Sequence, residues 1–66
     1  MEIFIGGEPQ TFASPLTVNE LLAGLSLSGR RIAVELNGEI VPRSRFDQVL
    51  LGPGDKLEIV TAVGGG

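Results

Sequence analysis

The chain has 66 residues, is 42% hydrophobic, carries a net charge of −3 and contains neither Cys nor His. This length corresponds to one small domain. The missing Cys and His exclude disulfides, thiolate or imidazole metal ligands and Ser-His or Cys-His catalytic pairs. A negative net charge also disfavours nucleic-acid binding, which depends on clustered Lys and Arg.

The chain opens with a pattern typical of a β-hairpin. Residues 1–5 alternate as in a half-buried strand, with Phe4 on the outer face. Gly6-Gly7 supplies a turn. Residues 10–13 are then expected to pair back as a second strand, with Phe12 directed into the core.

A helix is expected next. Ser14-Pro15 breaks the strand, and Thr17 and Glu20 have the T-x-x-E spacing of a capping box. Residues 26–29 end the helix, which at fewer than about ten residues depends on packing for its stability. Four apolar residues form one stripe at helical spacing: Val18, Leu21, Leu22 and Leu25.

A second hairpin follows the helix. Residues 32–36 alternate as a strand, and Asn37-Gly38 is the strongest short hairpin signal that a sequence offers. Residues 39–41 return as a short strand that Pro42 stops.

The last third of the chain is predicted to hold one irregular segment and one long strand. Residues 43–51 are expected to form a single helical turn or a loop, and residues 52–55 a turn. The final strand covers residues 56–63, with Leu57 and Ile59 facing inward. The irregular segment has three apolar anchors: Phe46, Val49 and Leu50. Further apolar residues indicate a final strand that is buried in part on both faces: Val60, Ala62 and Val63.

These elements predict one α+β domain. A right-handed crossover places the helix across one face of a mixed sheet of about five strands. Parallel pairing of the first and last strands at the centre gives a β-grasp sheet. We choose this order because it covers the single apolar helix stripe with one sheet, whereas periodicity alone does not determine it. The domain is expected to span residues 1–63, followed by a flexible glycine tail over residues 64–66.

The tail is the most informative feature of the sequence. Val63 is followed by Gly64, Gly65 and Gly66. Because glycine lacks Cβ, such a tail can pass through a channel too narrow for side chains. A terminal carboxylate is ionised at neutral pH and can attack an activated phosphate. The alternative interpretation is a frayed chain end without a role.

Several stretches together resemble the ThiS family, the sulfur carriers of the thiamine pathway. The resemblance lies in residues 1–7, 31–35, 37–44 and 54–60, and in the Gly-Gly terminus. Their order and spacing are more specific than any single piece. The resemblance implies a ubiquitin-like β-grasp fold and a role as a covalent sulfur carrier rather than an enzyme.

The resemblance also implies a reaction and its partners. A ThiF-type adenylating enzyme, using ATP and Mg, activates the terminal glycine, which then becomes a thiocarboxylate with sulfur from a sulfur-donating protein. A ThiG-type thiazole synthase receives that sulfur. By position, Gly66 carries the activated acyl group, and Gly65 completes the Gly-Gly motif in the partner channel. Gly64 stands where many carriers have another small or apolar residue. The chain itself is expected to bind no cofactor and no metal.

Three side chains outside the tail are candidates for partner docking. Phe4 is expected on the open face of the sheet, Val60 lies near the tail, and Arg43 lies in a loop with Arg45. Each has a simpler interpretation. A single exposed apolar residue needs no partner, Val60 is explained as core, and loop charges are usually solvated. The carboxylates are scattered along the chain and form no acid-base pair.

The sequence also predicts a location. Residues 1–5 lack the basic start and the long apolar core of a secretion signal. No apolar run approaches the roughly 18 residues of a membrane span. We therefore expect a cytoplasmic protein that binds no membrane.

Three other functions remain open. The small subunit of molybdopterin synthase resembles this chain in fold and tail, but that family tends to have a proline-containing segment before Gly-Gly, and residues 61–63 have none. A ubiquitin-like modifier would join Gly66 to target lysines. A β-grasp binding module would carry an inert tail. Deletion of Gly65 and Gly66 distinguishes the two covalent functions from the inert one.

Overall fold

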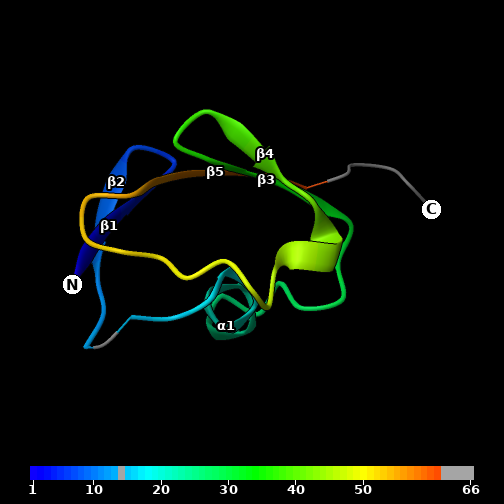
Figure 1. Ribbon diagram of the computed structural model, residues 1–66, viewed down its shortest axis with the longest axis horizontal. Coiled ribbons are helices and arrows are strands. Elements are labelled where there is room, and N and C mark those ends of the chain that lie inside the picture. The colour runs from blue at the N-terminus through cyan, green and yellow to red at the C-terminus, as the bar shows by residue number, and fades with distance from the viewer. Residues whose placement is uncertain (14, 62–66) are drawn as a thin grey trace.

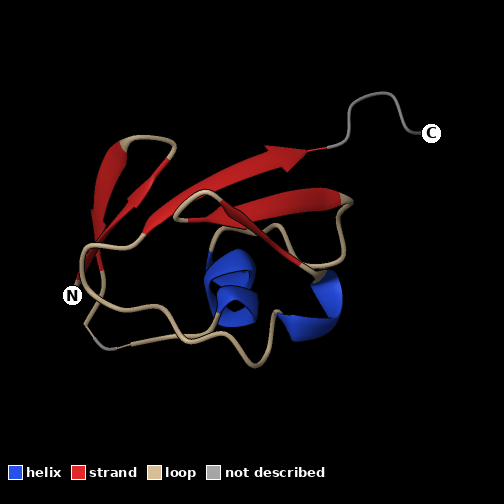
Figure 2. Ribbon diagram, turned by 45° about the horizontal axis from the view of Figure 1, so that its top comes forward, coloured by secondary structure: helices blue, strands red, loops and turns tan. Residues whose placement is uncertain are grey.

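The computed structural model describes residues 1–13 and 15–61. In these residues the sheet has five strands in the order β2-β1-β5-β3-β4. Figure 1 shows the sheet as one layer with α1 packed below it, and Figure 2 shows both helical segments on the same side of the strands. The elements are β1 (Glu2–Ile5), β2 (Glu8–Thr11), α1 (Val18–Gly24), β3 (Ile32–Leu36), β4 (Glu39–Val41), the 3-10 turn η1 (Arg43–Arg45) and β5 (Lys56–Thr61).

The first and last strands pair in parallel at the centre of the sheet. Phe4 lies opposite Lys56, and Ile5 lies opposite Leu57. The remaining neighbours, β1 with β2, β3 with β5 and β3 with β4, are antiparallel. A mixed five-stranded sheet covered by one helix is the β-grasp arrangement, so the predicted fold class is confirmed.

The first hairpin differs from the prediction in where its second strand begins. β2 covers Glu8–Thr11, so it begins two residues earlier than expected, includes Pro9 and ends before Phe12. Phe4 donates its backbone N–H to the Asp55 carbonyl at 2.9 Å, toward β5. The Phe4–Pro9 pair therefore exchanges no hydrogen bond, and an edge strand accommodates a proline at such a position. Phe12 is half-buried against the core, as predicted.

The helix begins where the capping box predicts. The backbone N–H of Glu20 donates to the Thr17 hydroxyl oxygen at 3.1 Å, and the Thr17 N–H donates to the Glu20 carboxylate at 2.8 Å. The expected stripe is shorter by one residue, because Leu25 caps the helix and is 38% exposed. Ser26 has a φ of 62°, and the Leu27 N–H donates to the Leu22 carbonyl. This Schellman-type ending packs Leu27 against the core in place of Leu25.

The second hairpin turns where expected. Asn37 and Gly38 have φ values of 51° and 87°, as a tight hairpin turn requires. The Asn37 side chain also binds the next turn: its amide donates to the Asp55 carboxylate at 3.1 Å, and its oxygen accepts from the Lys56 N–H at 3.0 Å. This contact joins the hairpin to the start of β5.

Besides Leu25, two further predicted core positions are wrong. Leu50 is 63% exposed, and Leu51 beside it is 1% exposed and fills the core instead. Leu50 forms an isolated bridge with Thr17, and neighbouring side chains of extended backbone point to opposite sides. Val60 is 62% exposed, so β5 is not buried on both faces at this position.

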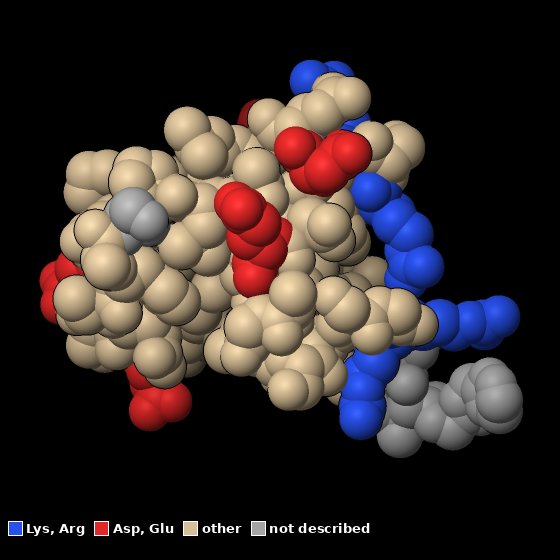
Figure 3. Space-filling view, turned by 90° about the horizontal axis from the view of Figure 1, so that it is seen from below, with Lys and Arg blue, Asp and Glu red and all other residues tan. Residues whose placement is uncertain are grey.

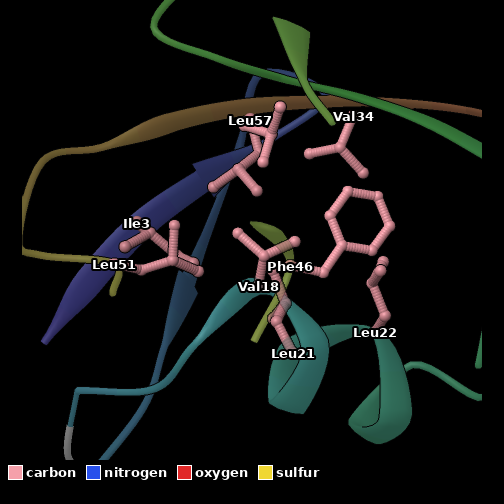
Figure 4. Close-up of a cluster of buried hydrophobic side chains, with 9 residues drawn as sticks. Ile3, Val18, Leu21, Leu22, Val34, Phe46, Leu51 and Leu57 are labelled. Atoms are coloured by element: carbon pink, nitrogen blue, oxygen red, sulfur yellow. The ribbon is translucent and has the colours of Figure 1, made fainter. Parts of the chain in front are cut away.

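One apolar cluster lies between the sheet and α1 (Figure 4). The inward faces of the strands contribute four residues to it, the helix three, and the segment after η1 two. No helix of the described residues is long and apolar enough to cross a membrane. The cluster comprises Ile3, Val34, Val41, Leu57, Val18, Leu21, Leu22, Phe46 and Leu51.

Candidate functional site

The predicted reactive residues follow the central strand. β5 ends at Thr61, while Ala62, Val63 and Gly64–Gly66 lie outside the described residues. β1 pairs with the start of β5, at Lys56 and Leu57, whereas β3 pairs along β5 as far as Thr61. Within the described residues, the end of β5 is therefore held by β3. The candidate site is therefore the surface around the end of β5.

The open face of the sheet carries two of the predicted docking residues. Leu57 and Ile59 pack on the helix side, so Lys56, Glu58 and Val60 face the other way. Phe4 is the neighbour of Lys56 on β1 and is half-buried. Val60 lies four residues after Lys56 on β5, and at the rise of a strand these two residues are about 13 Å apart. The structure thus places Phe4 and Val60 on one face without bringing them together.

The third docking residue, Arg43, lies beside Val60. Arg43 begins η1, which Figure 2 shows at the end of the sheet toward which β5 runs. A shallow hollow of about 430 Å³ opens there. We call it the arginine hollow; it is lined by Arg31, Ile32, Ala33, Arg43 and Val60.

Strand pairing assembles this hollow. Ala33 lies directly opposite Val60, and Ile32 lies opposite Thr61. β4 ends at Val41, which pairs with Val34 of β3. No strand of the described residues therefore pairs with Ala33 on the edge that faces away from β5. Arg31 immediately precedes β3, and the first residue of β3, Ile32, pairs with Thr61. The strand register therefore places Arg31 beside the end of β5. Arg31 is not among the docking residues predicted from the sequence, because only the pairing of β3 with β5 places it beside Val60.

Positive charge gathers at this end of the molecule. Figure 3 shows Lys and Arg side chains mainly at one end of the face that α1 covers, and carboxylates over the rest. Arg43 donates from Nη2 to the Arg30 carbonyl at 2.7 Å, which joins η1 to the loop before β3. The end of β5 is therefore bordered by cations on a chain whose net charge is negative.

The carboxylates show one arrangement that sequence reasoning missed. Glu35 of β3 lies directly opposite Glu58 of β5, and both are exposed on the open face. No group of three or more Asp or Glu that could hold a metal ion occurs in residues 1–13 and 15–61. The described part of the site therefore offers binding surface and charge around the end of β5.

Comparison with known proteins gives the family. A family model described as the ThiS family matches residues 2–66. The chain belongs to the ThiS family. A crystal structure of the ThiS thiamine biosynthesis protein from Geobacter metallireducens superposes with a TM-score of 0.85 at 36% identity, and the match covers 100% of both chains. The described residues therefore share the fold of that ThiS protein.

Two relatives have names that state a function. The chain is 42% identical to the sulfur carrier protein ThiS of Bacillus subtilis over 50 residues, which cover 76% of each chain. It is 48% identical over all 66 residues to a thiazole synthase of Paramagnetospirillum magneticum, but these residues make up only 20% of that protein. The chain therefore spans about a fifth of the length of that thiazole synthase.

Proposed function

We propose that this ThiS-family chain is a sulfur carrier of thiamine biosynthesis and that Gly66 carries the sulfur. The family match over residues 2–66 is the observation that supports the proposal most strongly. Similarity to the sulfur carrier ThiS of Bacillus subtilis supports the carrier role. Similarity to a thiazole synthase supports a ThiG-type thiazole synthase as the protein that receives the sulfur.

The proposed loading has two steps. The Gly66 carboxylate attacks the α-phosphate of ATP on a ThiF-type enzyme, which forms an acyl adenylate and releases pyrophosphate. Sulfide (HS⁻) supplied by a donor protein then attacks the Gly66 carbonyl carbon. A C–S bond forms, the C–O bond to AMP breaks, AMP and a proton leave, and the chain ends in a thiocarboxylate. In this proposal the chain is a protein co-substrate, while Mg and the catalytic groups belong to the activating enzyme.

The tail and the sheet have separate roles in this proposal. Gly65 lacks a side chain and fits a narrow channel that leads to the nucleotide, whereas the channel has room for a small residue at Gly64. The surface around the end of β5 contacts the rim of that channel. Exposed Val60 and nearby Arg43 suit this role, and Phe4 extends the same open face toward β1.

Adenylation is tested by ATP–pyrophosphate exchange with a ThiF-type enzyme. The wild-type chain is expected to support exchange, and a chain lacking Gly65 and Gly66 is not. Gly64→Ala is the matched control, because many carriers have a small residue there, and it is expected to retain exchange. Full exchange by the truncated chain contradicts the proposal.

A ubiquitin-like modifier remains the main competing function, since adenylation of Gly66 is common to both. The two differ in product. A carrier accumulates a free thiocarboxylate, whereas a modifier accumulates isopeptide adducts on target lysines. If cells yield lysine adducts that contain the Gly66 peptide but no thiocarboxylate on the chain, the chain is a modifier and not a sulfur carrier.

A further inference from the structure

The arginine hollow combines a cationic rim with an apolar floor. Arg31 and Arg43 are both exposed, and both line the hollow. Ala33 and Val60 form its floor as direct cross-strand neighbours. Val60 keeps 62% of its surface exposed although it lies next to the cations. Such a surface is suited to a ligand that carries a carboxylate beside an apolar side chain.

The Arg43 guanidinium is oriented by the protein. Its Nη2 donates to the Arg30 carbonyl at 2.7 Å, its one hydrogen bond within residues 1–13 and 15–61. A guanidinium has five N–H donors in a rigid fork, so four remain for an external acceptor. That fork matches the geometry of a carboxylate and loses little side-chain entropy when it is already held.

The location of the hollow separates it from the reacting group. Five residues follow Thr61 in the sequence, and an extended segment of that length reaches about 17 Å. When the tail extends into a channel, Gly66 and its nucleotide lie that far beyond β5. The hollow then faces the protein surface where the channel opens.

The hollow differs from a phosphate site in its floor. Phosphate sites use backbone N–H groups and polar side chains, whereas Ala33 and Val60 offer methyl groups. An acidic protein segment fits both the charge and the apolar floor.

We propose that the arginine hollow docks an acidic segment of the adenylating enzyme at the mouth of its tail channel. A carboxylate of that segment binds between Arg31 and Arg43, and an apolar side chain beside it packs on Val60. This inference rests on the proposed function, because it places the tail in that enzyme. It adds the chemistry by which the enzyme recognises the folded part of the carrier.

Charge reversal at Arg31 tests the proposal. The carrier concentration is varied in ATP–pyrophosphate exchange, which yields KM and kcat for the chain. Arg31→Glu is expected to raise KM roughly tenfold and to keep kcat within about twofold, because the tail is unchanged. Arg45→Glu is the matched control, since Arg45 is exposed on η1 but lines a different hollow, and its KM should stay within about twofold.

Two further variants separate the rim from the floor. Arg43→Lys keeps the charge but loses the fork, so its KM should lie between those of wild type and Arg31→Glu. Val60→Asp places a like charge under the proposed carboxylate and should raise KM by roughly tenfold. Equal KM values for Arg31→Glu and Arg45→Glu would overturn the proposal. Competitive inhibition by inorganic phosphate beyond that of chloride at equal ionic strength would also overturn it, in favour of a phosphate site.

Binding without ATP distinguishes this proposal from the proposed function. Calorimetry measures the affinity of the purified adenylating enzyme for each chain. If the wild-type chain binds the enzyme but supports no ATP–pyrophosphate exchange, this result contradicts the sulfur-carrier function. Equal affinities of wild type and Arg31→Glu contradict the docking role of the arginine hollow. Circular dichroism confirms that each variant is folded.

Discussion

Single side chains divide this small domain into a core and a contact surface. Leu22 is 2% exposed and belongs to the apolar cluster that includes Phe46. Leu50 has the same side chain but is 63% exposed. The same residue type therefore has different consequences at the two positions, and the pair provides a direct measure of core packing.

Leu22→Ala is expected to lower the free energy of unfolding by about 2–5 kcal/mol, because it removes buried methyl groups and leaves a cavity. In a domain of this size, such a loss is a large part of total stability. Urea denaturation measures it. Leu50→Ala is the control and should change stability by less than about 0.5 kcal/mol. Equal effects of the two substitutions would contradict the assigned core.

At the scale of elements, α1 is short and depends on its two ends. Seven residues, Val18–Gly24, make a helix that is marginal in isolation. The capping box at Thr17 satisfies donors at its start, and the turn at Ser26 satisfies carbonyls at its end. The three buried residues of the helix then hold it against the sheet.

Thr17→Ala is expected to destabilise the domain by about 1 kcal/mol, because the Glu20 N–H loses its acceptor. Thermal unfolding followed by circular dichroism measures the change. Asn19→Ala provides the control, since Asn19 lies exposed in the same first turn. A Thr17→Ala variant as stable as Asn19→Ala would show that the cap contributes nothing.

The sequence predicts local features of these elements better than long-range ones. The capping box and the Asn37-Gly38 turn depend on neighbouring residues, and both form as predicted. The predicted core position of Leu25 is wrong because helical spacing does not reveal the residue at which the helix ends. The predicted core position of Leu50 is wrong because an irregular segment has no periodicity that shows which side chains face the core.

In the candidate site, too, the sequence predicts the local feature but not the long-range one. The glycine tail is recognised from sequence alone, since its chemistry lies in consecutive residues. Arg31 and Val60 are 29 positions apart (60 − 31) and meet only through the register of β3 with β5. No local pattern contains that pairing, so Arg31 was missed.

At the scale of the whole molecule, the rigid sheet and the tail are expected to act independently. Gly65→Val lies beyond Thr61, the last residue of β5, so the melting temperature should match that of wild type. The added side chain should nevertheless block entry to a narrow channel and abolish ATP–pyrophosphate exchange. Gly64→Ala, with its smaller change, serves as the control. Normal exchange by Gly65→Val would contradict a narrow channel.

The central claim is that Gly66 carries sulfur as a thiocarboxylate. Intact-protein mass spectrometry tests this claim most directly, on the chain isolated from cells and again after incubation with ATP, Mg, a sulfur donor and the adenylating enzyme. We expect a mass gain equal to the difference between sulfur and oxygen, localised to the C-terminal peptide. An unchanged mass, in the presence of an enzyme shown to be active on another carrier, would contradict it.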